Sequence, residues 1–271
     1  MDKTIRIEVL FPEIANLYGD LENISYLKKS CPEIEVVETH LVGEPCFMEK
    51  TPDLIYMGTL TERGQRLATE KLAQYKAKIV EMIDAGVHFL VTGNALEVFG
   101  GKITDTNGTE DCGLEIFPVH AKRNMMNRFN SLYLAKFGEM DIVGYKSQFT
   151  HSYWDGENEG YVFDTVRGPG LNPEIIQEGI RRNNFLGTYV IGPVLVLNPP
   201  FAKWLLKEIG AGEVELAFEK EAMEAYEARV KEYSDENTQT AKEKNSCGFN
   251  AFRYSGSGMR CAAADGQRTG I

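Results

Sequence analysis

The chain has 271 residues, of which 43% are hydrophobic and 25% are charged. These proportions are typical of a soluble globular protein, and the length allows one large domain or one domain with an appendage. The formal net charge of −11 disfavours binding to nucleic-acid phosphates unless a local basic patch is present. We expect the basic side chains in mid-chain to form a solvated face: Lys122, Arg123, Arg128, Arg181 and Arg182.

The cysteines and the N-terminal residues exclude several classes of protein. The five cysteines are odd in number and show no C-x-x-C spacing, which argues against a disulfide framework and a structural zinc site. The first residues lack the basic and apolar regions of a signal peptide, and no apolar run approaches the roughly 18 residues that span a bilayer. We therefore expect a cytoplasmic protein with no membrane span, no metal and no cofactor.

Strands and helices alternate along the first hundred residues. Residues 62–85 have the spacing of an amphipathic helix, which ends at Gly86 in the position of a C-terminal cap. Such alternation predicts a mostly parallel sheet with helices on both faces, and ligands bind such sheets at the carboxyl ends of the strands. Residues 58–65 and 92–95 are therefore expected at that edge. The other expected elements are strands at 5–10, 35–40, 54–57 and 87–91, a helix at 23–29, and a further helix that starts with residues 96–99.

The pattern changes after residue 113. Short strands are expected at 114–117, 131–136, 142–145, 161–164 and 187–191, which we interpret as an antiparallel extension of the same sheet. Helices follow at 199–209 and 213–233. Residues 235–271 are rich in Asn, Ser, Gly, Ala and Thr and show no periodicity, so they are expected to form a disordered tail after a single domain at 1–234.

The most informative segment is the turn that follows the apolar run at 87–91. The run stops at Gly93, and a helical pattern begins by Leu96. This is the outline of a nucleophile elbow, a tight strand-to-helix turn whose surrounding N–H groups can stabilise an oxyanion. The tip nevertheless carries no nucleophile. Gly93 has no side chain, Asn94 cannot attack a carbonyl, and the hydroxyl of Thr92 lacks a histidine that could activate it.

Four motifs, one of which contains this turn, occur along the chain in an order that is typical of one protein family. They are NLYGD at 16–20 with Asn23, GTLTERGQ at 58–65, the elbow at 91–100, and GTYVIGP at 187–193. Together they resemble the class I glutamine amidotransferase domains of the cobyric acid synthase type. The resemblance is strongest to the glutamine-hydrolysing subunit of lipid II isoglutaminyl synthase, and it covers about residues 4–210.

The resemblance implies a specific chemistry. In the family, a cysteine at the elbow attacks the side-chain amide of glutamine, a histidine on a later strand relays the proton, and a glycine-rich loop supplies oxyanion contacts. The released ammonia passes to a Mur-ligase-like, ATP-dependent synthetase partner, which amidates a glutamate of a peptidoglycan precursor.

Mapped onto this chain, the catalytic pattern is broken at three places. The cysteine position falls on Gly93, the histidine position on Ile191, and the glycine-rich loop reads Gly58-Thr59-Leu60. Asp20 is retained, with a turn residue as its simpler interpretation. The ligand-binding candidates that remain are Gly58, Thr59, Arg63, Gln65, Thr92, Asn94 and Arg128. For Arg63 and Gln65, a helix-capping or surface role is an equally good interpretation.

No other residue replaces the missing pair convincingly. Cys112 lies in a polar loop, where a structural or exposed thiol is favoured, and His151 is favoured as a surface or core histidine. Glu97 is interpreted as a carboxylate that complements the dipole of the elbow helix.

The sequence therefore predicts a glutamine-amidotransferase-like protein without intact catalytic residues. It would serve as a non-catalytic or regulatory partner of a Mur-ligase-like amidating enzyme in cell-wall precursor modification. Its pocket would be vestigial or would bind a small polar ligand such as glutamine. The alternative is an active subunit that hydrolyses glutamine to supply ammonia for lipid II or cobyric-acid-type amidation.

Overall fold

The computed structural model describes residues 4–240 and is built around a six-stranded sheet. All neighbouring strands of this sheet are parallel except β12, which pairs antiparallel with β13 at one edge. The α/β class predicted from the sequence is confirmed. In spatial order the strands are β12 (Ile180–Arg182), β13 (Phe185–Thr188), β4 (His88–Thr92), β3 (Leu54–Met57), β1 (Arg6–Leu10) and β2 (Glu35–Thr39).

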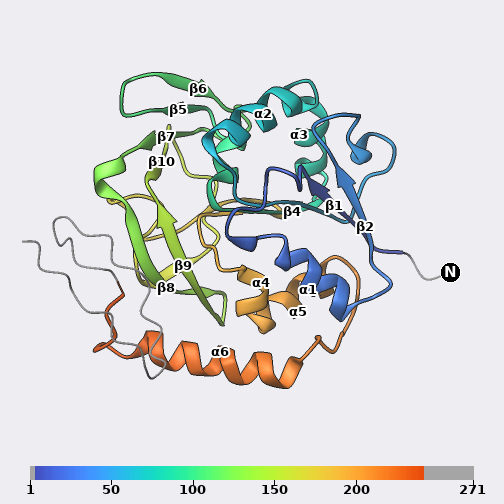
Figure 1. Cartoon of the computed structure of the whole chain (residues 1–271), viewed down its shortest axis with the longest axis vertical. Coiled ribbons are helices and arrows are strands. Elements are labelled where there is room, and N and C mark those ends of the chain that lie inside the picture. The colour runs from blue at the N-terminus through green and yellow to red at the C-terminus, as the bar shows by residue number, and fades with distance from the viewer. Residues whose placement is uncertain (1–3, 241–271) are drawn as a thin grey trace, which may run out of the picture.

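Successive residues of the central strands supply two different cores. In β3, Leu54 and Tyr56 belong to one buried cluster, whereas Ile55 and Met57 belong to another, because side chains alternate between the faces of a strand. The first cluster includes residues of α1 (Glu22–Ser30), α4 (Val194–Leu197) and α5 (Pro199–Glu208). The second includes residues of α2 (Glu62–Ala73) and α3 (Lys76–Asp84). Helices thus cover both faces (Figure 1).

The helix expected at 62–85 is divided into α2 and α3. Its first part begins at Thr61, whose side chain accepts a hydrogen bond from the N–H of Gly64. The break comes at Tyr75, which leaves helical geometry (φ −105°, ψ 6°) and packs its ring edge-on against Phe47. Gly86 adopts φ +82° just beyond α3, as expected for a C-terminal cap.

The part expected to extend the main sheet forms two separate sheets instead. One has the order β10 (Thr150–Trp154), β7 (Val119–Arg123), β5 (Lys102–Thr104), β6 (Glu110–Cys112), and the other the order β11 (Asp164–Arg167), β8 (Phe129–Phe137), β9 (Met140–Gln148). All neighbouring strands in these two sheets are antiparallel except β5 and β7. An isolated bridge between Tyr145 and Ile191 connects β9 to the chain after β13. The small sheets therefore stand over the carboxyl edge of the main sheet.

Several expected boundaries were wrong. Residues 114–117 are not a strand, because the N–H groups of Ile116 and Phe117 both donate to the carbonyl of Phe99 and so bind the turn after β4. The expected strand at 187–191 ends at Thr188. The last helix, α6 (Glu219–Ser234), begins only after Phe218, whose φ of +54° interrupts the helical pattern.

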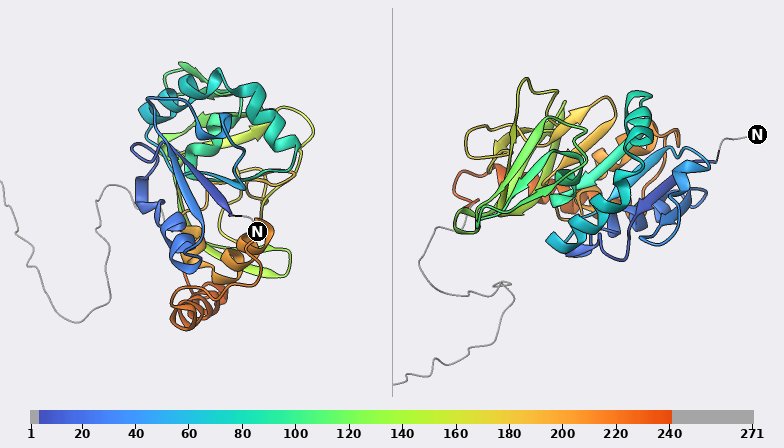
Figure 2. Two further views of the ribbon diagram at one scale, coloured as in Figure 1. Left: turned by 90° about the vertical axis from the view of Figure 1, so that its right-hand side faces the viewer. Right: turned by 90° about the horizontal axis from the view of Figure 1, so that it is seen from above.

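Two polar contacts attach the C-terminal helices to the small sheets. Buried Asn198, between α4 and α5, accepts from the N–H of Val143 (2.7 Å) and donates to its carbonyl (2.8 Å). Tyr226 of α6 donates to the carbonyl of Asp141 (2.9 Å). Helix α6 consequently lies at the opposite end of the molecule from α2 and α3 (Figures 1 and 2).

The first residues of the expected tail contact the domain. The guanidinium of Arg167 donates to the carbonyls of Tyr233, Asp235 and Thr238, and the N–H of Leu132 donates to the carbonyl of Thr240 (2.7 Å). Residues 241–271, the rest of that predicted tail, lie outside the described residues. Within residues 4–240, no helix has both the length and the hydropathy required to cross a membrane.

We expect Asn198→Ala to lower the free energy of unfolding by roughly 2–4 kcal/mol, because it leaves both backbone groups of Val143 without partners in a buried position. Chemical denaturation of the two proteins measures the difference. Asn237→Ala, at an exposed position, is the matched control and should cost less than about 0.5 kcal/mol. A loss no larger than the control's would contradict the anchoring role of Asn198.

Candidate functional site

The turn after β4 has the geometry of an elbow. Strand β4 ends at Thr92, Gly93 takes up φ +61°, and the 3₁₀ helix η3 (Gly93–Phe99) begins there. Positive φ is easily adopted only by glycine. Because Met57 is in register with Val91 on the neighbouring parallel strand, the loop after β3 meets this turn. Residues 58–65 and 92–95 therefore share the carboxyl edge, as the sequence predicted.

Thr59 fills the space that a side chain at position 93 would need. A Cβ placed on Gly93 would lie 2.8 Å from Cγ2 and 2.9 Å from Cβ of Thr59, with Oγ1 closer still. The hydroxyl of Thr59 is held in place because it donates to Oδ2 of Asp20. The tip of the elbow thus carries no side chain, and Thr59 occupies the space into which a side chain would extend.

Asp20 is the anchor of this arrangement and is not a simple turn residue. It is fully buried, and its Oδ2 accepts from the N–H of Thr59 (2.9 Å) and the hydroxyl of Thr92 (2.8 Å) in addition to the hydroxyl of Thr59. Burial raises the pKa of the carboxyl, although these hydrogen bonds act in the opposite direction. Gly58 permits the contact, since a Cβ there would lie 3.0 Å from Cβ of Asp20.

Asn94 occupies the next part of the same loop. Its Oδ1 accepts from the N–H of Leu60 (2.9 Å), and its Nδ2 donates to the carbonyl of Leu60 (2.9 Å). The N–H groups of Thr59 and Leu60 belong to the loop to which the resemblance assigns oxyanion contacts. Both are already used within the protein, so in this conformation they cannot stabilise an oxyanion.

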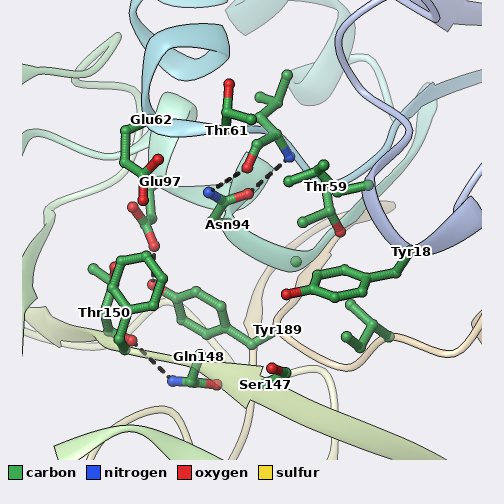
Figure 3. Close-up of a pocket in the computed structure, with 15 residues that line it drawn as sticks. Tyr18, Thr59, Thr61, Glu62, Asn94, Glu97, Ser147, Gln148, Thr150 and Tyr189 are labelled. Atoms are coloured by element: carbon green, nitrogen blue, oxygen red, sulfur yellow. Dashed lines mark hydrogen bonds between the residues drawn. The ribbon is translucent and has the colours of Figure 1, made fainter. Parts of the chain in front are cut away.

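A cavity of about 110 Å³ lies between the elbow and the small sheets. Gly93 and Ile191 both line it, so the structure brings together the two positions to which the resemblance assigns the catalytic residues. Ile191 is buried, and its backbone pairs with Tyr145 in both directions (3.0 and 3.1 Å). Figure 3 shows the other lining residues, which are Leu17, Tyr18, Thr59, Leu60, Thr61, Glu62, Asn94, Glu97, Ser147, Gln148, Phe149, Thr150 and Tyr189.

Glu97 is a functional candidate that the sequence interpretation missed. It is not a surface carboxylate at the start of a helix. It lies buried on the cavity wall, where it accepts from the hydroxyl of Tyr189 (2.8 Å) and from Nε2 of Gln65 (2.9 Å). Burial raises the pKa of this carboxyl to about 7. The sequence did contain a signal for this burial. Apolar residues lie on both sides of Glu97, whereas a turn exposed to solvent does not require apolar neighbours.

Gln65 and Arg123 connect this carboxylate to the small sheet. Gln65 is buried and accepts from Nη2 of Arg123 (3.1 Å). Arg123 was expected on a solvated face, and that expectation was wrong. Its side chain is buried, and Nη1 lies 3.1 Å from Asp105 and 3.5 Å from Asp111. Gln65 therefore acts behind the cavity and does not line it.

The remaining candidates are dispersed. Arg128 is exposed, but it donates to the hydroxyl of Ser147 (2.6 Å) and so reaches the cavity rim. Arg63 is exposed on α2 and does not line the cavity. Thr92 is buried behind the elbow. His151 is buried against the carbonyl of Asn127 (3.1 Å), and Cys112 is exposed on β6; neither lines the cavity.

Among residues 4–240, no group of three or more His, Cys, Asp or Glu side chains could hold a metal ion.

Sequence comparison reveals two related proteins. The chain is 33% identical over 199 residues to the lipid II isoglutaminyl synthase (glutamine-hydrolyzing) subunit GatD of Staphylococcus aureus, covering 71% of this chain and 79% of that protein. It is 24% identical over 214 residues to the subunit of the same name from Streptococcus pneumoniae, covering 73% and 77%. No family model matches.

Structure comparison adds little. A glutamine amidotransferase from Thermotoga maritima aligns over 85% of this chain and 92% of its own, with a TM-score of 0.47 and 11% identity.

We expect Glu97→Gln to change how stability depends on pH. The native pKa is about 7, against an ordinary value of 4.5. Between these values the native carboxyl keeps its proton and the unfolded one loses it, so the unfolding free energy of the parent falls as pH rises, by up to roughly 3 kcal/mol. A glutamine cannot titrate. Between pH 4.5 and 7, the unfolding free energy of the variant should therefore rise relative to that of the parent, and denaturation curves at several pH values measure this difference.

Exposed Glu44 supplies the control for this experiment. Glu44→Gln is measured in the same buffers as the matched exposed substitution, and the gain should be specific to Glu97→Gln. Parallel pH profiles for Glu97→Gln and the parent would show that Glu97 titrates normally.

Proposed function

The chain belongs to the family of glutamine-hydrolysing subunits of lipid II isoglutaminyl synthase, and on that premise we propose that it is a subunit of this type without glutaminase activity. It acts as a non-catalytic or regulatory partner of a Mur-ligase-like, ATP-dependent synthetase that amidates a cell-wall precursor. The partner and the reaction are carried over from the family resemblance. The loss of activity is argued from the site.

The observation that carries the proposal is the closed elbow at Gly93. Covalent amide hydrolysis requires a nucleophile and a base within hydrogen-bond reach of each other. Gly93 offers no side chain, Thr59 occupies the adjacent space, and Ile191 is apolar. Within the described part of the chain, neither a cysteine nor a histidine lines the cavity. The covalent route through a thiol and an imidazole is therefore missing.

The contacts that close the elbow support a stable, non-catalytic state. Asp20 holds Thr59, and Asn94 holds Leu60, each through hydrogen bonds between parts of the chain far apart in sequence. The scaffold of the site is thus retained with its polar groups paired to one another. Such pairing stabilises the fold. It also leaves the backbone N–H groups of Thr59 and Leu60 unable to donate to a bound ligand.

We expect no sustained release of glutamate from glutamine by the unmodified chain, alone or with a co-purified partner. Gly93→Cys alone should also be inactive, because Thr59 obstructs the new side chain and no base is present. Gly93→Cys with Thr59→Gly removes the obstruction, and adding Ile191→His supplies an imidazole. Only the triple variant should show measurable turnover, and the assay is glutamate release under identical conditions for all four proteins.

A thiol-labelling control separates obstruction from misfolding. Gly156 is exposed with open space around its Cβ position, so Gly156→Cys reports the rate of an unhindered surface thiol. Gly93→Cys should label more slowly than this control, and Thr59→Gly in the same chain should speed the labelling.

One result would overturn the proposal. Thr59 lines the cavity and donates its hydroxyl to Asp20, so a carboxylate-assisted threonine is the residual nucleophile that the site could offer. Sustained turnover by the unmodified chain, abolished by Thr59→Val or Asp20→Asn in a folded protein, would establish an active amidotransferase subunit.

The partner is tested separately by affinity purification. Recovery of a synthetase chain in stoichiometric amount supports the assembly. If this protein is co-expressed with such a synthetase and is still purified alone as a monomer, the assembly is contradicted.

A further inference from the structure

One wall of the cavity carries an acceptor without a partner. Gln148 is 6% exposed and lines the cavity. Its Nε2 donates to the carbonyl of Thr150 (3.0 Å), whereas its Oε1 has no hydrogen-bond partner within the described structure. Because an unsatisfied buried acceptor costs roughly 1–3 kcal/mol, this oxygen requires a donor that the protein does not supply.

The same wall carries a carboxylate without a counter-ion. Glu97 is 2% exposed, and the side chains that donate hydrogen bonds to it, Gln65, Tyr189 and Thr150, are all neutral. Among residues 4–240, no cation forms an ion pair with Glu97. Buried charges in proteins are usually paired. Figure 3 shows Glu62 on this side of the cavity as well, which makes the local potential more negative.

Three side-chain donors of the lining residues are already used. Nδ2 of Asn94 donates to the carbonyl of Leu60, the hydroxyl of Thr59 donates to Asp20, and that of Tyr189 donates to Glu97. The part of the cavity at Glu97 and Gln148 therefore offers acceptors and, above the pKa of Glu97, negative charge. It selects a ligand that brings N–H donors and a positive charge.

We propose that the cavity binds ammonium, or the primary ammonium group of a small amine, with Glu97 and Gln148 as its acceptors. The volume of about 110 Å³ suits a ligand of a few heavy atoms, since one water molecule takes up about 30 Å³ of the liquid. Such a site would hold ammonium from solution beside the amidating partner. That role rests on the proposed function, whereas the binding site itself does not.

The test is titration of the full chain with ¹⁵N-ammonium chloride at pH 8 and constant ionic strength, followed by NMR and calorimetry without glutamine. We expect saturable binding, competition by methylammonium, and no competition by potassium or tetramethylammonium, which lack N–H donors. Glu97→Gln and Gln148→Leu should each weaken binding by about tenfold or more, because each removes a buried acceptor. Glu44→Gln should bind like the parent.

Two outcomes would overturn the proposal. Absence of saturable binding would show that water alone satisfies these acceptors, and equal competition by potassium would show a nonspecific cation effect. If Glu97→Gln fails to fold, Gln148→Leu and the tetramethylammonium competition still decide the question. Glutamate release is not measured here, so failure of this proposal is distinguishable from failure of the proposed function.

Discussion

The buried carboxylate of Asp20 is the constraint on which the site depends. It follows a 3₁₀ turn, yet its oxygen binds the backbone and hydroxyl of Thr59 and the hydroxyl of Thr92, each from a different β–loop junction. Moving Thr59 away from Gly93 would remove two of the three hydrogen bonds to this buried oxygen, and lost hydrogen bonds to a buried charged acceptor are costly. The loop therefore stays over the elbow, and the empty tip is not a space that a new nucleophile could simply occupy.

A second buried network gives the cavity its electrostatic character. Glu97 lies at the centre of hydrogen bonds that run through Gln65 to Arg123 on one side and to Tyr189 on the other. Arg123 is itself balanced by Asp105 and Asp111, so it does not neutralise Glu97 directly. Residues of the small sheet therefore determine the charge on the cavity wall. Because Arg123 pairs with Asp105 and Asp111, Glu97 keeps no counter-ion of its own within the described part of the chain.

These two networks reconcile family membership with the altered residues. The packing and the loop positions of this chain depend on the alternation of buried residues and on small residues at close approaches such as Gly58. The proposed loss of glutaminase activity concerns instead the particular atoms at Gly93 and Ile191. A fold tolerates the loss of such atoms when neighbouring polar groups pair with one another, as Asn94 and Leu60 do.

The sequence by itself determined the elements whose physics is local. The buried strand at residues 54–57, the cap at Gly86 and the turn at Gly93 each depend on neighbouring residues, and each was predicted from the sequence. The break at Tyr75, the late start of α6 at Glu219 and the burial of Arg123 were not, because each depends on a contact or a backbone angle with no local signature. Only the tertiary structure decided that Thr59 closes the elbow and that Glu97 lies buried. Both facts arise from side chains that meet across large separations in sequence, where composition and spacing carry no record of which atoms pair.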